Sequence, residues 1–405
     1  MSQVGRSLGR KLRGAIVLGL WALVAAPAAA RPASPLDAMQ AMLTRTSVRK
    51  FDQGRAVSDV ELRKIMDAGF RTQTLDGSSP FEFVQIRSKE TLAAIAGSAK
   101  FADWMAGAPA AIAVLVNTKQ SPRLFRENGS LAVLNMSYKA QELGLGTCFL
   151  GTRNYTKTKQ ILGVDRHRHL LTVIPVGAPA GPAVSPKRYP LEWTVSQGTY
   201  GGALKLLAGT APATTTGKPI SAFIDGKHTV TESFAPRPVE ADKLATAFEA
   251  MRHAPSSKNK QHWRWVLVTD PAARQQVARA ARDRALADAP VIAVLAGSQD
   301  SRPFVNPKGW GKKRTSPTFI NHGASMALRN LQIGLESQGL GVRTAALNKR
   351  GDSRMRVLLG GEQRLSSKRV QFIAAVGMGY AQRTSTQKAK DLPGARVFKE
   401  RYGAR

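Results

Sequence analysis

The sequence of 405 residues contains a single cysteine, and this scarcity excludes several classes of protein. An internal disulfide is impossible, and a cysteine-based metal site is excluded. Cys148 lies in the apolar run from Gly146 to Leu150, which indicates a buried structural thiol. The six histidines show no zinc-ligand spacing, and no nucleophile triad is recognisable. The side chains alone therefore suggest neither a metal enzyme nor a nucleophilic one.

Acidic residues are also scarce: 27 Asp and Glu stand against 60 Lys and Arg, which gives a formal net charge of +33. Such a charge attracts anionic partners, among them nucleic acid, lipid head groups and acidic polymers. The sequence has no zinc-finger spacing, no RNP-like aromatic motif and no heptad run, and its basic residues are scattered. We therefore expect non-specific attraction to anionic surfaces and no specific nucleic-acid site.

The first thirty residues have the features of a targeting segment. Basic residues precede an apolar run at 15–26, and Ala28 to Ala30 offer a small-residue cleavage site. The run is short for a transmembrane helix, and no twin arginine precedes it. We interpret residues 1–30 as a cleavable secretory signal for the periplasm or the exterior. A mitochondrial presequence is the alternative, because no acidic residue precedes Asp37, and an uncleaved anchor is the third reading.

The length predicts two domains, and the chain shows a plausible division between them. The stretch 201–217 is rich in Gly, Ala, Thr and Pro and is typical of a linker. Before it, Ser34-Pro35 predicts the start of one helix, and a capping box at Ser58 and Glu61 predicts the start of a second, with Val60 among its apolar residues. The stretch 130–143 predicts a third helix. Alternating or continuous apolar runs at 81–86, 111–116 and 171–177 predict strands of a sheet covered on both faces.

After the linker the same order of patterns recurs. Trp263 to Val266 corresponds to Phe81 to Val84, and the run 289–295 corresponds to 108–114. The stretch from His228 to Phe234 then lies opposite 45–51, at an offset of 228 − 45 = 183. We infer a tandem duplication with a first copy at 34–200 and a second copy at 218–405. Two copies in one chain can pack as an internal dimer.

The first copy opens with a motif of two arginines and a serine, Arg45-Thr46-Ser47-Val48-Arg49-Lys50-Phe51. Arginine presents a planar fork of donors that matches phosphate oxygens, and the serine adds a rotatable donor. In an extended segment the alternate residues point one way, and on a helix the two arginines share a face, so either conformation can converge on one anion. The alternative reading is a solvated basic turn.

The duplicated unit resembles the FMN-dependent nitroreductase family, and the chain resembles a tandem-domain member of it. The resembling pieces are the arginine–serine motif, the run 143–148, the segment 186–191 and the segment 254–263. The last of these, Ala-Pro-Ser-Ser-Lys-Asn-Lys-Gln-His-Trp, is similar to the family's Pro-Ser-x-x-Asn-x-Gln-x-Trp signature. The resemblance implies an α+β fold: two nitroreductase-like units, each a mixed β-sheet flanked by helices, packed as an intrachain pseudo-dimer.

The resemblance also implies an FMN site at the interface of the two copies. Arg45, Thr46 and Ser47 would bind the phosphate and ribityl groups, and Lys187 and Arg188 would complete the phosphate clamp. In the same comparison Arg49 would lie near N1 and O2 of the ring, where a cation stabilises reduced flavin. The segment against the ring would be formed by Phe149, Leu150, Gly151 and Thr152. The second copy would contribute Pro255, Ser256, Ser257 and Asn259.

The two copies depart from the family in complementary ways. The first copy has Thr72 to Ser79 in place of the Pro-Ser-x-x-Asn segment, and the second has His228 to Glu232 in place of the arginine motif. We therefore expect one complete FMN site per chain and one degenerate mirror site. Trp263 is expected in the core. For His253 and His262 two interpretations stay open: general acids, or loop histidines whose hydrogen bonds are satisfied by their neighbours.

We accordingly predict an FMN-dependent oxidoreductase of nitroreductase type, with no catalytic residue apart from the flavin. It would pass electrons from a donor such as NAD(P)H to a small acceptor such as a quinone or nitroaromatic. It would act as a monomer in which the two copies form the pseudo-dimer. The alternatives are a flavin-sequestering protein without turnover and a basic scaffold protein.

Overall fold

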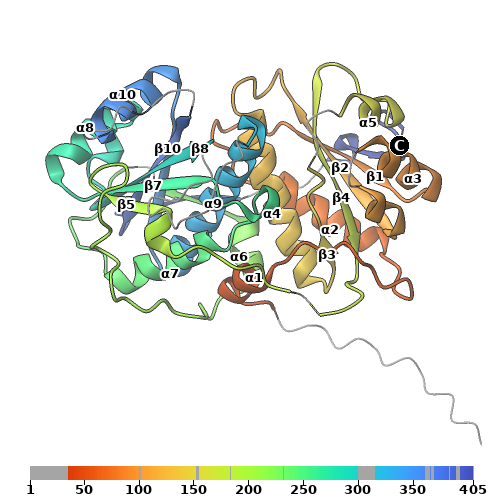
Figure 1. The fold of residues 1–405 in the computed structure, drawn as a ribbon, viewed down its shortest axis with the longest axis horizontal. Coiled ribbons are helices and arrows are strands. Elements are labelled where there is room, and N and C mark those ends of the chain that lie inside the picture. Colours follow the sequence, from red (N-terminus) through yellow and green to blue (C-terminus); the bar gives the residue numbers. More distant parts are fainter. Residues whose placement is uncertain are drawn as a thin grey trace, which may run out of the picture. The chain divides into compact units, whose positions relative to one another are not determined.

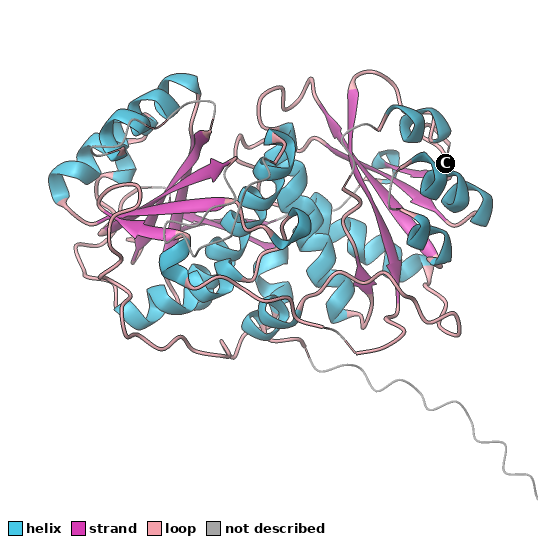
Figure 2. Ribbon diagram, viewed as in Figure 1, coloured by secondary structure: helices cyan, strands magenta, loops and turns pink. Residues whose placement is uncertain are grey.

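The fold is α+β and comprises two similar halves, each with a five-stranded sheet and flanking helices (Figures 1 and 2). The structure, a computed structural model, describes residues 35–404 with the exception of 100–101, 152–154, 183, 231, 300–314, 361–364, 366–368, 383 and 389–392, and without the side chains of 227–228 and 384–388. The predicted signal at 1–30 and the predicted site residue Thr152 lie outside the described residues.

The first half alternates helices with strands before the chain reaches the predicted linker. Its elements are α1 (Ala38–Thr44), α2 (Asp59–Phe70), β1 (Phe81–Ile86), α3 (Lys89–Ser98), the 3₁₀-helix η1 (Asp103–Gly107), β2 (Ala110–Asn117), α4 (Phe125–Glu142), β3 (Gly146–Thr147), α5 (Thr156–Ile161), β4 (Arg168–Gly177), η2 (Leu191–Trp193) and β5 (Val195–Gln197).

The second half repeats this order with an added two-stranded ribbon, β6 with β11. Its elements are α6 (Ile220–Asp225), β6 (Gly226–Val230), α7 (Ala241–Arg252), η3 (Ser257–Asn259), β7 (Trp263–Val268), α8 (Pro271–Ala281), η4 (Arg284–Leu286), β8 (Val291–Ser298), α9 (Pro317–Ser337), β9 (Gly341–Ala346), α10 (Lys349–Leu359), β10 (Val370–Gly379), β11 (Thr384–Lys388), η5 (Gly394–Arg396) and β12 (Val397–Lys399).

The two halves exchange an edge strand. The first sheet has the order β12-β1-β2-β4-β3, and the second has the order β5-β7-β8-β10-β9. Strand β12, from the end of the chain, pairs in parallel with β1, so that Val397 lies opposite Phe83. Strand β5, from the end of the first half, pairs in parallel with β7, so that Val195 lies opposite Trp265. Each sheet is therefore completed by the other half, while the predicted domain boundaries stay predictions.

Two long helices, α4 and α9, pack against one another between the two sheets (Figure 1). Most of their residues are buried, 12 of 18 in α4 and 16 of 21 in α9, which explains why α4 begins at Phe125 although the sequence predicted a start at 130. Asn128 and Gly129 are poor helix formers, and packing on both sides overrides that preference. Buried polar pairs cross the contact: Arg329 Nε donates to Asn135 Oδ1 at 3.0 Å, and the Tyr138 hydroxyl donates to Asn330 Oδ1.

Other local predictions have mixed outcomes. The capping box at Ser58 and Glu61 is present at the start of α2, with both reciprocal hydrogen bonds. Val60, expected on the apolar face of that helix, is 63% exposed, because it falls outside the stripe that faces the core. Helix α1 begins later than the Ser34-Pro35 pair suggested, because Asp37 caps it by accepting from the amides of Met39 and Gln40.

The repeat register differs from the sequence-based one by a single residue at its start. A Cβ on Gly146 would meet Val48, and a Cβ on Gly341 would meet Val230 in the same way. These contacts match Val48 with Val230, an offset of 230 − 48 = 182, and so match Arg45 with Lys227. The prediction that His228 stands opposite Arg45 is therefore wrong, because the second half carries one additional residue before Phe234.

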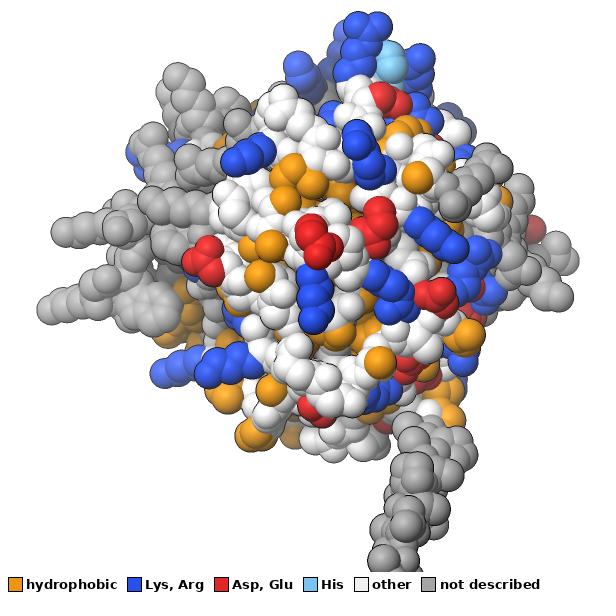
Figure 3. All heavy atoms as spheres, turned by 90° about the vertical axis from the view of Figure 1, so that its right-hand side faces the viewer, with side chains coloured by type: hydrophobic (Ala, Val, Ile, Leu, Met, Phe, Trp, Pro, Cys, Tyr) orange, Lys and Arg blue, Asp and Glu red, His pale blue; other side chains and the backbone are white. Residues whose placement is uncertain are grey.

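The surface carries charges of both signs. On the face shown in Figure 3, basic side chains are interspersed with acidic and apolar ones. Within the part of the chain that the structure describes, no helix is both long enough and apolar enough to cross a bilayer.

Candidate functional site

The arginine–serine motif of the first half runs beside strand β3. Val48 donates its amide to the Thr147 carbonyl at 2.9 Å, and Ser47 forms a parallel bridge to Thr147. This approach depends on Gly146, since a Cβ there would lie 2.2 Å from the Val48 Cγ2. In the extended conformation Ser47 and Arg49 project to one side. The local geometry thus presents alternate residues of the motif to one region.

Loop 253–261 of the second half reaches the same region in a strained conformation. Lys258, Asn259 and Gln261 all have positive φ angles, 53°, 53° and 48°, which non-glycine residues rarely adopt. The Ser256 hydroxyl accepts from the Gln261 amide at 2.9 Å and so closes the turn. Gly323 of α9 lets this loop approach closely, because a Cβ there would lie 3.3 Å from Ser256 Cβ.

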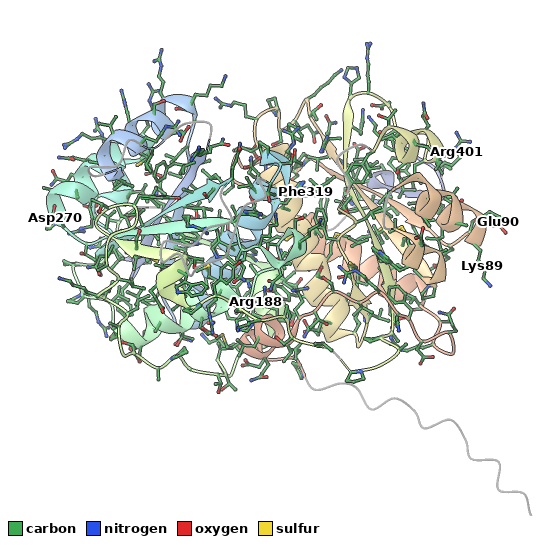
Figure 4. All side chains as sticks on the ribbon, in the orientation of Figure 1. Lys89, Glu90, Arg188, Asp270, Phe319 and Arg401 are labelled. Atoms are coloured by element: carbon green, nitrogen blue, oxygen red, sulfur yellow. The ribbon has the colours of Figure 1, made fainter. Side chains whose placement is uncertain are left out.

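A cavity of about 290 Å³ lies between these segments. Eight of the predicted site residues line it, five from the first half and three from the second: Ser47, Arg49, Phe149, Leu150, Gly151, Pro255, Ser256 and Ser257. The structure therefore brings together residues about two hundred positions apart. Figure 4 shows Phe319, a further lining residue, where the two halves meet.

The sequence did not single out six other residues that line the cavity: Trp104, Lys258, Phe319, His322, Gly323 and Met326. Trp104 lies under Arg49, with the Arg49 Cζ 5.7 Å from the ring centroid. Among the described lining residues, Arg49 and Lys258 are cationic and none is acidic. The cavity therefore favours an electron-rich or anionic occupant.

Arg45 lies beside this cavity rather than in its lining. Its side chain is 7% exposed, and its Nε has no hydrogen-bond partner among the described residues. Burial lowers the pKa of Arg45, and the nearby Tyr138 and Cys148 act in the opposite direction. A buried guanidinium with an unpaired N–H is costly unless an anion reaches it. Half-buried Thr46, the next predicted residue, does not line the cavity.

Arg188, labelled in Figure 4, lies close enough to Arg45 for the two charges to interact. Burial, and then the charge of Arg45, lower the pKa of Arg188 to about 10. Its Nε is also buried without a partner among the described residues. Two neighbouring guanidinium groups, each with an unpaired buried donor, form a site suited to a dianionic group such as a phosphate.

The remaining donors of Arg188 hold the loop of the second half. Nη1 donates to the Ala254 carbonyl at 3.0 Å and to Asn259 Oδ1 at 2.9 Å, and Nη2 donates to the His253 carbonyl at 2.9 Å. Asn259 Nδ2 in turn donates to the Lys187 carbonyl at 2.7 Å. The side chains of Arg188 and Asn259 are thus hydrogen-bonded to one another. The contact of either residue with a cofactor stays a prediction.

The two histidines weighed as general acids have structural surroundings. His262 is fully buried outside the cavity lining, and burial lowers its pKa to about 3. His253 Nε2 lies 3.1 Å from Glu249 Oε1. Trp263 is completely buried, so the prediction that it belongs to the core is confirmed, and Cys148 is buried as expected.

The mirror-related position is built differently. Asp76 stands opposite Lys258 (258 − 182 = 76), and its carboxylate accepts from Ser121 Oγ at 2.6 Å and from Asn128 Nδ2 at 3.0 Å. Asn128 stands opposite Gly323, with the offset of 195 that also relates Gly144 to Gly339. Asn128 Oδ1 accepts from the Leu75 amide at 2.8 Å. Side chains and a negative charge thus stand where the other site has a glycine and a cation.

Together, the exchanged strands and the shared cavity define a two-half α+β protein with a site between its halves. A model of the Nitroreductase family matches residues 96–178 and 224–287. A protein of Methanothermobacter thermautotrophicus, provisionally named NADH dehydrogenase/NAD(P)H nitroreductase, is 30% identical over 155 residues, covering 36% of this chain and 80% of that protein. One of the same name from Archaeoglobus fulgidus is 25% identical over 150 residues, covering 35% and 86%. The chain belongs to the nitroreductase family.

The chain is also similar to solved structures of nitroreductase-family proteins. An FMN-dependent nitroreductase from Clostridium difficile is 23% identical, with 36% of this chain and 90% of that chain covered and a TM-score of 0.34. A protein from Parabacteroides distasonis is 26% identical, with 38% and 94% covered and a TM-score of 0.37.

Proposed function

We propose that the protein is an FMN-dependent oxidoreductase that passes electrons from NAD(P)H to a small acceptor such as a quinone or nitroaromatic. The observation that carries this proposal is the cavity lined jointly by Ser47 and Arg49 of the first half and Pro255, Ser256 and Ser257 of the second. Relatives named as NAD(P)H nitroreductases support the choice of donor and acceptor.

The residues present fit FMN at both of its ends. The unpaired donors of Arg45 and Arg188 suit the phosphate, and the apolar walls with neighbouring hydroxyls suit a flat polar ring. When bound, FMN supplies the two-electron redox chemistry that these side chains lack. Arg49 and Lys258 bring positive charge to the ring cavity, where it stabilises added negative charge. Trp104 and Phe319 add aromatic surface to the cavity wall.

We propose one FMN per chain. Asp76 and Asn128 fill the mirror position, and hydrogen bonds from Ser121, Ser78 and Asn128 outweigh burial and lower the pKa of Asp76. The carboxylate is therefore ionised at neutral pH and repels an anionic ligand. The flavin released from a denatured sample should equal the protein in molar amount; two flavins per chain would contradict the single composite site.

The enzyme reading is tested on the purified protein. We expect a yellow protein whose flavin is bleached by NAD(P)H and restored by a quinone or nitroaromatic acceptor. Arg45→Met and Ser257→Ala should each lower flavin affinity, because the two residues come from different halves of one site. A loss in only one variant would contradict the shared site. A colourless protein that rejects added FMN would refute the proposal as a whole, and bound flavin without turnover would point to sequestration.

We further propose that residues 1–30 direct export and are then removed, and that the protein acts as a monomer whose halves form the pseudo-dimer. The sequence features of 1–30 and the exchanged strands β5 and β12 support these two proposals. Cell fractionation with N-terminal sequencing tests the first, and the mass in solution tests the second. A retained N-terminus or a stable dimer would contradict them.

A further inference from the structure

His322 is the one histidine among the described residues lining the cavity, and its ring is held on two sides. His322 lies near the N-terminal end of α9, in the second half of the molecule, and the residue is 6% exposed. Its Nδ1 lies 2.7 Å from the hydroxyl of Ser130, which belongs to α4 of the other half. The Phe149 ring packs against it, with centroids 5.3 Å apart and planes inclined by 49°. These contacts fix the plane of the imidazole.

The hydrogen bonds of Ser130 also determine where the proton of His322 lies. Ser130 Oγ is 2.7 Å from the main-chain carbonyl oxygen of Arg126, which can only accept. The single hydroxyl hydrogen of Ser130 must therefore be donated to the Arg126 carbonyl. The Ser130 oxygen then accepts from His322, so that Nδ1 carries the imidazole proton. Nε2 is left as a lone-pair acceptor, the tautomer being set by the partner of the other nitrogen.

Nothing among the described residues pairs with His322 Nε2, and the ring contributes to the cavity wall. The cationic side chains there, Arg49 and Lys258, can only donate, and Ser256 Oγ already accepts from Gln261. Burial, with His169 and Arg126 nearby, lowers the pKa of His322 to about 3, so the ring stays neutral at physiological pH. The cavity thus contains a permanent nitrogen acceptor among donors.

We propose that His322 selects electron acceptors that carry an O–H or N–H group, such as hydroxylated or amino-substituted nitroaromatics and quinones. The O–H or N–H donates to Nε2, while the partially negative nitro or quinone oxygens face Arg49 and Lys258. Ser130 is the positioning residue that keeps Nε2 unprotonated. A substrate without the donor leaves Nε2 unpaired, which costs binding. This inference rests on the proposed oxidoreductase function of the same cavity.

The tautomer is tested by NMR on protein labelled with ¹⁵N-histidine. Among the six ring patterns, the one that is lost in His322→Phe belongs to His322. We expect a protonated Nδ1 and an unprotonated Nε2 between pH 6 and pH 8. Titration with 4-nitrobenzyl alcohol should move the Nε2 signal, and its methyl ether, which lacks the donor, should not. A protonated Nε2, or equal shifts with both compounds, would overturn the inference whether or not the protein turns over.

The selectivity is tested by kinetics on the flavin-loaded enzyme. The ratio of kcat/KM for the alcohol to that for the ether should fall by about three- to tenfold in His322→Phe, the worth of one neutral hydrogen bond. Ser130→Ala should lower this ratio by a smaller factor, and its NMR spectrum should show a protonated Nε2, because the acceptor that holds the proton on Nδ1 is gone. His167→Phe, outside the cavity, should keep the wild-type ratio. An unchanged ratio in a His322→Phe enzyme that binds flavin normally would refute the selectivity alone, whereas absent flavin would refute the proposed function.

Discussion

Arg188 and Asn259, 71 positions apart, are joined by a hydrogen bond of 2.9 Å from Nη1 to Oδ1. Arg188 belongs to the end of the first half, and Asn259 has a positive φ angle in the loop of the second. The arginine therefore links the segment that precedes the exchanged strand β5 to the loop that lines the cavity. A residue expected to bind phosphate also holds the other half of the site in its strained shape.

Replacing Arg188 by methionine should destabilise the flavin-free protein. The variant keeps an apolar stem but leaves the carbonyls of His253 and Ala254 and the Asn259 amide oxygen without their charged donor. We expect the free energy of unfolding to fall by about 2 kcal/mol, as for other hydrogen bonds to charged groups. Urea unfolding measures this loss. The matched variant Lys187→Met changes an exposed side chain and should have little effect; equal losses would contradict the role of Arg188.

Replacing Arg45 by methionine should remove the preference for FMN over riboflavin. Arg45 is buried with an unpaired Nε and, in the proposed site, meets only the phosphate end. We expect FMN affinity to fall roughly tenfold to a hundredfold, the worth of a charge-assisted hydrogen bond, with riboflavin affinity unchanged. Flavin fluorescence measures both. An Arg49→Met control should weaken both ligands alike, because Arg49 lines the ring cavity; equal losses for both ligands in Arg45→Met would contradict the assignment.

Replacing Gly146 by alanine should displace the arginine–serine motif. The new Cβ would lie 2.2 Å from Val48 Cγ2 and 2.7 Å from Val48 Cβ, so the motif or β3 must move. We expect a loss of about 1–3 kcal/mol in the free energy of unfolding, together with weaker flavin binding. Gly97→Ala is the control, since a Cβ there meets nothing within 4 Å and alanine favours the helix. If both variants were equally stable, the close approach would not matter.

Glu336 should make stability depend on pH. Its Oε2 is inaccessible and has no partner among the described residues, and burial raises its pKa from 4.5 to about 7, against the charge of Arg329. The folded state therefore holds a proton that the unfolded state releases, and stability falls as pH rises from about 4.5 through 7.

Glu336→Gln should consequently stabilise the protein by about 2–3 kcal/mol at pH 8 and by much less at pH 5. Urea unfolding at the two pH values measures the difference. The exposed Glu192→Gln serves as the control. A gain that is the same at both pH values would show that the carboxylate is not the cause.

Much of the fold could be predicted from local patterns, because buried strands such as β1 and β2 carry continuous or alternating apolar residues. The exchange of β5 and β12 could not, because each has three residues, too few for a periodic signal. Their pairing also joins segments far apart in the sequence. Likewise, the start of α4 was set by packing against α9 rather than by the propensities of Asn128 and Gly129.

The residues of the cavity, too, were only partly predictable from the sequence. Motif residues such as Ser47 and Ser257 could be found because their types and spacing form a pattern. His322 could not, because it is an isolated histidine in an apolar helix whose partner, Ser130, lies 192 positions earlier. His228 was wrongly aligned with Arg45, in place of Lys227, because a one-residue insertion before Phe234 is invisible to pattern matching.

The exchanged strands have a consequence for how this chain could diverge. In a dimer of identical subunits, a loss in one copy is a loss in both, and each subunit must find its partner by diffusion. Here the linker keeps each half at a high effective concentration near the edge that it completes. Complementary changes, such as Asp76 in the first half and His228 to Glu232 in place of the arginine motif in the second, are then inherited together. A cut at the linker would return the protein to a bimolecular assembly, with two non-interchangeable parts that must meet before either sheet is whole.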